Sequence, residues 1–406
     1  MHLSAYFTLF LLNPFFAAVF SLARRNQRNL TLVAMCFCAF YGASQLISNE
    51  KDNGRYRDKF YEMHDRQVTW TSFRESLWDG QTTVDVAIPL ISFVAALVTR
   101  NERILFAVFG IVFGFFYGRN LQFVYSHLPR SKIPPFLALL VAVAALVVPF
   151  WAGLSSVRMW MGAHVFFYGA SRYMSYKQAR YLLFVAAAGL VHFSFTVVAL
   201  MFAAFYFTRL RRREGLWFAL FVATFLFAEI GAGTVREIIR GYAPAIYESK
   251  AEAYTEGSYV EDYSELTKQR SWHARYYQPA LFYSICFLLV LTYRRTRRRR
   301  ILTDVERAFL SFAFVVFAFA NSITFLPAGS RFYWVASLFA MIPIIKYYQH
   351  ATSRTMIHLT TIPILFWLVV SIRDGFDLIT LATIISNPVI IWGGGYTDIS
   401  LMSFIK

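Results

Sequence analysis

Charged residues are scarce in this chain. Only 16% of its 406 residues are Asp, Glu, Lys or Arg, whereas a soluble domain carries about 25%. Hydrophobic residues make up 57%, and apolar stretches of transmembrane length recur from Ala5 to Trp392. This composition excludes a soluble enzyme and predicts an all-α, polytopic integral membrane protein with a single membrane domain over 1–406.

Cysteine and the sequence motifs of soluble enzymes are also lacking. The three cysteines lie within apolar runs, so no disulfide framework is expected. The chain has no phosphate-binding loop, dinucleotide fingerprint, zinc-ligand spacing or serine elbow, so we expect no metal and no cofactor. No basic region precedes the first apolar run, which favours an uncleaved anchor over a cleaved signal peptide.

Acidic residues are few relative to basic ones, and the formal net charge is +17. The basic excess lies in short loops, at Arg24–Arg28, Arg209–Arg213 and Arg294–Arg300. Short basic loops of helical membrane proteins are cytoplasmic. We therefore interpret the charge as contact with the lipid bilayer and its anionic headgroups, and we expect no nucleic-acid partner.

Two long polar segments, 48–83 and 234–277, differ from these loops because their positive and negative charges nearly balance. This balance predicts that both lie on the outer, periplasmic side. Both segments are also rich in aromatic residues, which indicates helices that lie on the membrane surface rather than free loops.

The apolar runs predict about twelve or thirteen membrane segments, the first of them one helix over Ala5–Ala23. Segments 84–99 and 104–125 cannot both cross the membrane, because they would join an outer loop to a basic loop that belongs inside. Either one of them is re-entrant, or an interfacial helix hides a further crossing. No internal repeat is visible, which disfavours a transporter.

Segment 181–207 has basic residues at both ends, although it is long enough for a full crossing. The positive-inside rule therefore favours two short helices that meet near His192, with both ends cytoplasmic. His192 would then lie at the outer end of a shallow hairpin.

Two ionisable residues inside the central apolar region, Arg158 and His192, are the main candidates for chemistry. A charge at membrane depth is costly and by default marks a functional site. Arg158 follows a break at Gly153–Ser156 and heads a predicted helix, where amides and a guanidinium suit phosphate oxygens; a snorkelling interfacial arginine is the alternative. His192 is a candidate base or phosphate donor, or a histidine satisfied by a backbone carbonyl. We expect both at one level, near one membrane face.

Further candidates lie on the predicted outer side. Asp52 opens the first long segment and is a candidate base, unless it is an ordinary solvated charge. Arg331 follows a Pro-Ala-Gly-Ser turn and has the same two interpretations as Arg158. The remaining candidate substrate-binding residues lie in or near the second long segment: Glu229, Arg236, Arg240, Arg270, Trp272 and Arg275. Surface ion pairing of the charged residues, and interfacial anchoring of the tryptophan, are the simpler interpretations.

Together these motifs resemble the EpsG-like branch of the Wzy-type polysaccharide polymerases. The matching positions, in chain order, are Gly42, then Asp52, Tyr56 and Phe60 at four-residue steps, Arg158 before Gly162 and Ala163, Leu190–Ser194 around His192, Ser330–Tyr333 around Arg331, and Ser386–Pro388. Gln45, Val157 and Met159 depart from the family pattern.

The resemblance implies a fold similar to C-type integral-membrane glycosyltransferases and a site that faces the periplasm of the bacterial inner membrane. It implies a polymerase that joins undecaprenyl-diphosphate-linked oligosaccharide repeat units, donor and acceptor, into O-antigen, capsule or exopolysaccharide. Arg158 and Arg331 would hold the diphosphate without metal, Tyr56 would contact the substrate, and Asp52 or His192 would be the base. A chain-length regulator protein is a further candidate partner. An O-antigen ligase or other lipid-linked sugar transferase, and a transporter or flippase, remain as alternatives.

The predicted topology can be tested by thiol labelling. Cysteines placed near Asn53 and near Gly257, one in each long segment, should react with an impermeant thiol reagent in intact cells after outer-membrane permeabilisation. A cysteine at Arg211 should be protected until the cells are lysed. Labelling at Arg211 with protection of the other two would reverse the predicted orientation.

Overall fold

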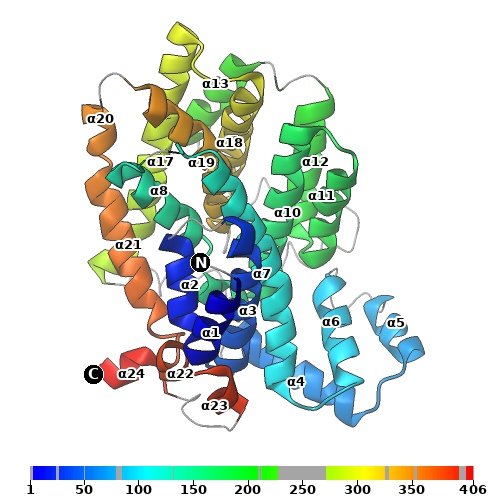
Figure 1. The fold of residues 1–406 in the computed structure, drawn as a ribbon. Helices are drawn as coiled ribbons and strands as arrows, with labels where there is room; N and C mark the ends of the chain where they lie inside the picture. The colour runs from blue at the N-terminus through cyan, green and yellow to red at the C-terminus, as the bar shows by residue number, and fades with distance from the viewer. Residues whose placement is uncertain are drawn as a thin grey trace.

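In the residues that it describes, the computed structural model consists almost entirely of helices (Figure 1). It describes residues 3–23, 27–49, 51–78, 85–130, 132–208, 211, 213–226, 271–324, 329–351, 354–392 and 399–405. The helices are α1 (Leu3–Leu12), α2 (Pro14–Ala23), α3 (Gln27–Ser44), α4 (Asp52–Asp65), α5 (Trp70–Trp78), α6 (Ala87–Ala96), α7 (Glu102–Ser126), α8 (Pro135–Leu146), α9 (Phe150–Ser155), α10 (Val157–Tyr176), α11 (Arg180–Val191), α12 (Ser194–Phe207), α13 (Glu214–Leu226), α17 (Trp272–Arg299), α18 (Asp304–Ser322), α19 (Arg331–His350), α20 (Thr355–His358), α21 (Thr361–Gly375), α22 (Leu381–Ile385), α23 (Pro388–Trp392) and α24 (Leu401–Ile405). Within these ranges no strand forms beyond one isolated bridge between Thr380 and Ser400.

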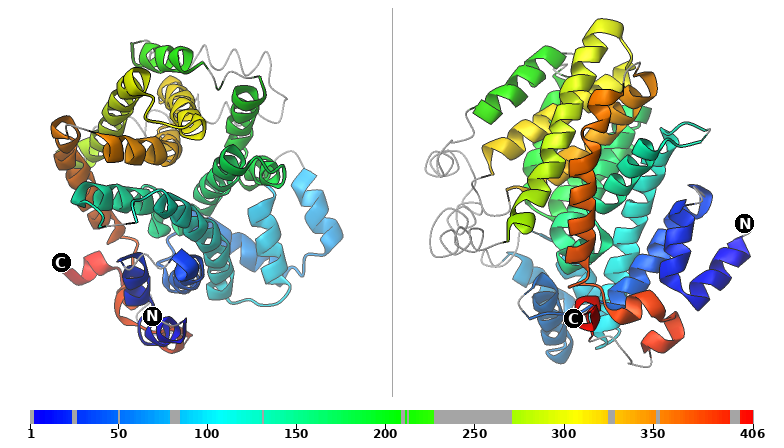
Figure 2. Two further views of the ribbon diagram at one scale, coloured as in Figure 1. Left: turned by 45° about the horizontal axis from the view of Figure 1, so that its top comes forward. Right: turned by 90° about the vertical axis from the view of Figure 1, so that its left-hand side faces the viewer.

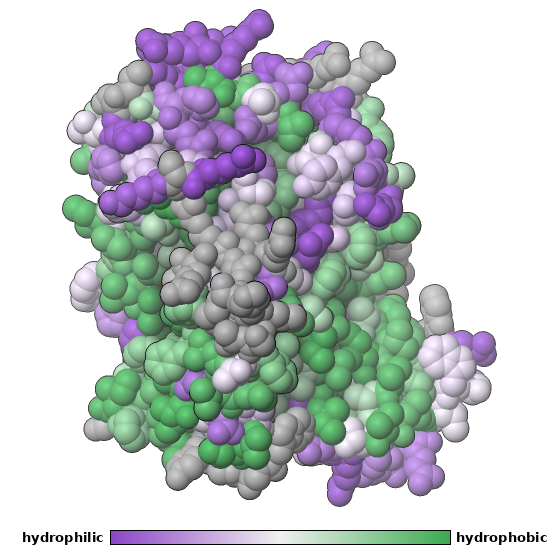
Figure 3. Space-filling view, in the orientation of Figure 1, coloured by the Kyte–Doolittle hydropathy of each residue, from purple (hydrophilic) through white to green (hydrophobic). Residues whose placement is uncertain are grey.

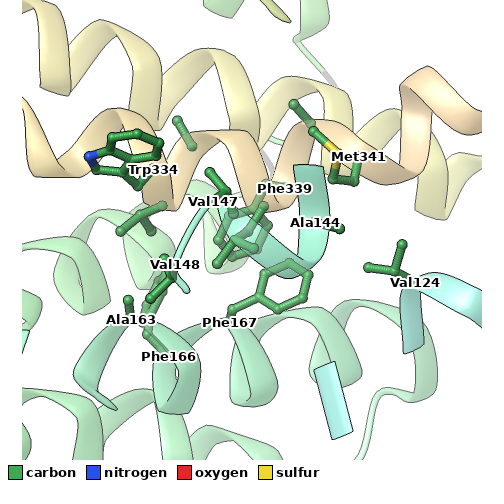
Figure 4. Close-up of a cluster of buried hydrophobic side chains, with 14 of the residues drawn as sticks. Val124, Ala144, Val147, Val148, Ala163, Phe166, Phe167, Trp334, Phe339 and Met341 are labelled. Atoms are coloured by element: carbon green, nitrogen blue, oxygen red, sulfur yellow. The ribbon is translucent and has the colours of Figure 1, made fainter. Parts of the chain in front are cut away.

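The core is apolar and aromatic. Figure 4 shows its centre, where Phe166 and Phe167 of α10 meet Phe339 of α19. Figure 3 shows a broad hydrophobic band on the visible face below a hydrophilic upper end. Five helical segments of the described chain are long and apolar enough to cross a membrane, and shorter apolar helices accompany them. The protein is therefore an all-α, multi-pass membrane protein, as the composition predicted.

The closest helix pairing joins α3 to α7, and glycines make it possible. A Cβ on Gly110 would lie 2.1 Å from the carbonyl oxygen of Cys38, and one on Gly42 would lie 2.1 Å from that of Phe106. Gly114 and Gly118 continue this face of α7 at four-residue steps. Small residues at such spacing let two helix backbones touch, which is how helices associate where lipid removes the hydrophobic driving force.

The structure resolves the parity problem in favour of α7. Its 25 residues extend about 37 Å, enough for a hydrocarbon core of about 30 Å. The 10 residues of α6 extend only about 15 Å. The end of α6 returns to α4, where His64 Nδ1 lies 2.6 Å from the carbonyl oxygen of Ala96. Helix α6 is therefore too short to cross the membrane alone. Helices α4, α5 and α6 lie together beside the lower end of α7 (Figure 1).

The predicted hairpin around His192 is confirmed. Helix α11 ends at Val191, and α12 begins at Ser194. Near the far end of α12, Tyr206 packs on Tyr173 of α10, with ring centroids 5.0 Å apart, and its hydroxyl contacts Lys177. Because α11 starts just after Lys177, both open ends of the hairpin lie at one level and His192 lies at its tip. Neither arm is long enough to cross a membrane alone.

The single first helix predicted over Ala5–Ala23 is wrong. The chain bends at Asn13, and α1 folds back on α2, so that the rings of Tyr6 and Phe20 lie 6.2 Å apart. Pro14 begins the second helix, as the fixed φ of proline favours, and the side chain of Asn13 caps it by accepting from the amide of Phe16 at 3.0 Å. Figure 2 shows this pair at the edge of the molecule, beside the C-terminal helices.

Substitution of Gly110 by Ile should break the α3–α7 contact. The added side chain has no space against the backbone at Cys38, and overpacking typically costs about 1–3 kcal/mol or more. We expect a lower unfolding temperature in detergent and a smaller monodisperse fraction. Gly215→Ala is the matched control, since a Cβ there meets only the Tyr293 hydroxyl at 3.5 Å. Equal stability of the two variants would contradict the close-packing argument.

Candidate functional site

A cavity of about 490 Å³ opens where α4, α5 and α6 meet the start of α10. It brings together three of the predicted site residues, Asp52, Tyr56 and Arg158. Its other ionisable lining residues are Arg55, Lys59, Glu62 and Arg66, so cations outnumber carboxylates. Such a cavity suits an anionic substrate that also presents hydroxyl groups.

Arg158 lies in the first turn of α10, and its side chain is 28% exposed. Its Nε donates to the hydroxyl of Tyr56 at 2.9 Å, and its Nη1 donates to Asp85 at 3.1 Å. Ser156, just before the helix, provides no side-chain cap. The guanidinium, at the start of a helix, therefore makes this corner of the cavity suitable for phosphate oxygens.

Tyr56 comes from α4 and packs edge-on against Phe109 of α7, with ring centroids 6.1 Å apart. Burial raises the pKa of its hydroxyl to about 12, although the charge of Arg158 opposes the rise. Tyr56 therefore stays a neutral phenol near neutral pH, with its oxygen accepting from Arg158 and its proton available to a second partner.

Asp52 begins α4 and lines the cavity, with its side chain 18% exposed and paired with Arg55. Its position is fixed by the preceding loop. Asn53 donates to the carbonyl of Leu46 at 2.9 Å, and a Cβ on Gly54 would lie 2.4 Å from the carbonyl oxygen of Ser48. The loop thus folds tightly back on α4 and directs this helix start at the cavity.

His192 does not line this cavity, but it lies close behind it. Its Nδ1 lies 2.7 Å from the hydroxyl of Ser194 and accepts from the Ser194 amide at 3.3 Å. The neighbouring amide of Phe193 donates to Asp85 at 2.8 Å, and the other oxygen of Asp85 accepts from Arg158. One carboxylate therefore links Arg158 to the hairpin tip that carries His192. That the two residues lie at one level near one membrane face stays a prediction.

The other predicted site residues do not line this cavity. Arg331 begins α19, next to Phe332, whose ring lies 6.0 Å from that of Phe195 in the hairpin. Trp272 begins α17 and stacks on Phe366 of α21, and Arg275 lies exposed one turn further on. Glu229, Arg236, Arg240 and Arg270 lie outside the described residues. For all of these, a role in substrate binding stays a prediction.

Asp85 is the residue that the sequence analysis missed. It is only 2% exposed and precedes α6, so it begins an apolar run just after a long polar segment. The rule that selected Arg158, a lone charge at the start of an apolar run, applies equally to Asp85. The rule also applies to Arg172, 4% exposed, which instead ties α10 to α7 by donating to Asn120 at 3.1 Å.

Neither metal ligation nor the second cavity offers an alternative site. Among the described residues no group of three or more His, Cys, Asp or Glu side chains could hold a metal ion. The second cavity, of about 560 Å³, lies between α2, α3, α7, α8 and α21, and no ionisable residue other than tyrosine lines it. The two tyrosine hydroxyls there, of Tyr117 and Tyr125, donate to backbone carbonyls. Of these two cavities between described residues, the one at Arg158 is therefore the candidate site.

Gly162, one turn after Arg158, allows the hairpin tip to dock. A Cβ there would lie 2.8 Å from the ring of Phe195 and 3.4 Å from Cβ of His192. Because Phe195 is fully buried, its ring has little room to move. Gly162→Val should therefore displace the tip and lower activity strongly, whereas Gly162→Ala should have a smaller effect. Activity and thermal stability of both variants would test this, and normal activity of the valine variant would contradict it.

Comparisons with known proteins give one match. No curated protein and no solved structure matches the chain. The model of the EpsG family matches residues 29–380, a range that includes the described part of the cavity, the hairpin and α19. This range covers most of the 406 residues. The chain therefore belongs to the EpsG family, which acts in polysaccharide biosynthesis.

Proposed function

We propose that this protein is a lipid-linked repeat-unit polymerase of the bacterial inner membrane, with its cavity open to the periplasm. It would transfer a growing glycan from undecaprenyl diphosphate to a hydroxyl of another undecaprenyl-diphosphate-linked repeat unit. The observation that supports this best is Arg158 at the start of α10, half-buried in a cavity that also contains Asp52 and Tyr56. Membership of the EpsG family supports the same chemistry.

The leaving group determines what the site must supply. As the bond from the anomeric carbon to the diphosphate oxygen breaks, the electron pair and the negative charge stay with the lipid diphosphate. Arg158 would stabilise that charge by Nη2, since Nε and Nη1 are held by Tyr56 and Asp85. The first amides of α10 would add further donors. The chain thus needs no divalent metal for this step.

The acceptor needs a base, and the geometry favours Asp52 over His192. Asp52 lines the cavity and can take the proton of the attacking hydroxyl. Nδ1 of His192 accepts from the Ser194 amide, so the neutral ring carries its proton on Nε2. In that tautomer His192 is a donor, suited to a phosphate or glycan oxygen rather than to deprotonation of the acceptor.

The direct test is polymerisation by the purified protein. Proteoliposomes would receive the undecaprenyl-diphosphate-linked repeat unit extracted from cells that lack this protein, and the products would be separated by length. A ladder of longer glycans on the lipid is expected, with and without a chelator. Transfer only to a lipid A core would indicate a ligase. Movement of the lipid across the bilayer without lengthening would indicate a flippase, and either result would overturn the proposal.

Arg158 should be the least replaceable residue of the cavity. A lysine cannot donate to Tyr56, Asp85 and a diphosphate from one planar group. Arg158→Lys and Arg158→Ala should therefore both lower the rate about a hundredfold, because loss of such a donor costs roughly 3 kcal/mol in the transition state. The measurement is the initial rate of glycan lengthening at equal protein level.

Arg373→Lys is the matched control, because Arg373, in the last turn of α21, is half-exposed and pairs with Asp374 and Asp377. It should polymerise like the wild type. If Arg158→Lys also does so, Arg158 is an interfacial anchor and the assignment of the site is wrong.

A further inference from the structure

The segment before α6 makes one contact with Arg158 and two with the tip of the α11–α12 hairpin. Asp85 accepts from Arg158 Nη1 at 3.1 Å and from the Phe193 amide at 2.8 Å. The next residue, Val86, donates its amide to the carbonyl of Leu190 at 2.8 Å. Asp85 is 2% exposed and does not line the cavity. Its contacts therefore act on other residues and not on the substrate.

The partners of Asp85 compensate its buried negative charge. A buried carboxylate is stable only where a cation and hydrogen-bond donors replace water. One oxygen receives the guanidinium of Arg158 and the other receives the backbone amide at the hairpin tip. The two donors approach different oxygens of one rigid group, so the angle of the guanidinium and the place of the tip are set together.

We propose that Asp85 is a positioning residue for the transfer reaction, which rests on the function proposed above. It fixes the orientation of the Arg158 guanidinium beside the cavity, and it holds the Phe193 amide so that His192 stays beside Gly162 of α10. Without it, Arg158 can turn toward solvent and the hairpin tip loses an anchor. The residue would then govern the rate of transfer more than the binding of substrate.

Two kinds of variant separate the charge of Asp85 from its contact with the tip. Asp85→Asn removes the negative charge and replaces one carboxylate oxygen by an NH2 group, which donates and cannot accept. One of the two donors, Arg158 or the Phe193 amide, then loses its acceptor. Phe193→Pro removes the donor at the tip and leaves Asp85 intact. The backbone permits this change, since Phe193 has φ −51° and His192 before it is extended. Phe193→Ala is its control, because it loses the same ring and keeps the amide.

The first measurement is steady-state kinetics of glycan lengthening. Asp85→Asn should lower kcat at least about tenfold with a smaller change in KM, as expected for loss of a charge-assisted contact that orients a group. Phe193→Pro should lower kcat by about the same factor relative to Phe193→Ala. Glu214→Gln, which breaks an ion pair with Arg307 away from the cavity, should leave kcat unchanged.

The second measurement does not depend on the proposed function. A spin label at Leu190, which is 56% exposed on the last turn of α11, reports the mobility of the hairpin tip. Its mobility should rise in Asp85→Asn and in Phe193→Pro but not in Phe193→Ala or Glu214→Gln. Thermal stability of each variant would identify any that fail to fold. If Asp85→Asn does not fold, the comparison of Phe193→Pro with Phe193→Ala still tests whether the contact with Asp85 anchors the tip.

The outcomes are distinguishable. Unchanged label mobility, or unchanged kcat in both variants, overturns the positioning role. If the wild type itself lengthens no glycan, the proposed function falls together with the catalytic part of this inference. The label still shows in that case whether Asp85 anchors the tip.

Discussion

The ion pair between Arg158 and Asp85 is the contact on which the arrangement around the cavity depends. Neither charge is stable alone at this depth, because each loses most of its water. The pair joins α10 to the segment before α6, and Asp85 adds the tip of the α11–α12 hairpin through the Phe193 amide. Tyr56 adds α4 through its hydroxyl. Four separate parts of the chain thus meet at two side chains, which is why the cavity forms there.

Close backbone contact is the second constraint, and it supports the first. Lipid chains are as apolar as leucine, so membrane helices gain most from fitting closely together. Glycines on α7 bring α3 within touching distance, and Gly162 does the same for α10 and the hairpin tip. The α3–α7 pair carries Phe109, on which Tyr56 packs. The small residues of α7 thus set the position of Phe109, and through it the position of Tyr56 beside Arg158.

The sequence predicted the properties that follow from local composition. Scarce charge and long apolar runs predict a helical membrane protein, and basic residues at both ends of 181–207 predict the hairpin. The bend at Asn13 was missed because the length of the apolar run outweighed the visible Asn-Pro pair. The parity problem was left open because the apolar run of 84–99 does not show how much of it is helical, and only the fold shows that α6 has 10 residues.

The site was predicted only in part, for a related reason. Arg158 stands out because it interrupts an apolar region, and Asp52 and Tyr56 follow from a spaced motif. Asp85 is, like Arg158, a lone charge at the start of an apolar run. It follows a segment rich in charged residues, however, so the sequence does not show that it is buried. Its partners, Arg158 and the Phe193 amide, are more than seventy residues away in the chain. Only the fold shows that they share one carboxylate.

The hairpin tip has a consequence for the order in which the protein is assembled. A chain enters the membrane from its N-terminus, so the segment at Asp85 and Val86 is in place before 180–207 has been synthesised. The tip has backbone donors and acceptors that need partners wherever water is excluded, and Val86 and Asp85 satisfy two of them. The segment at Asp85 and Val86 thus provides hydrogen-bond partners for the hairpin before the hairpin has been synthesised. A chain whose segment at Asp85 and Val86 is misplaced would leave these two backbone groups of the hairpin tip without their partners.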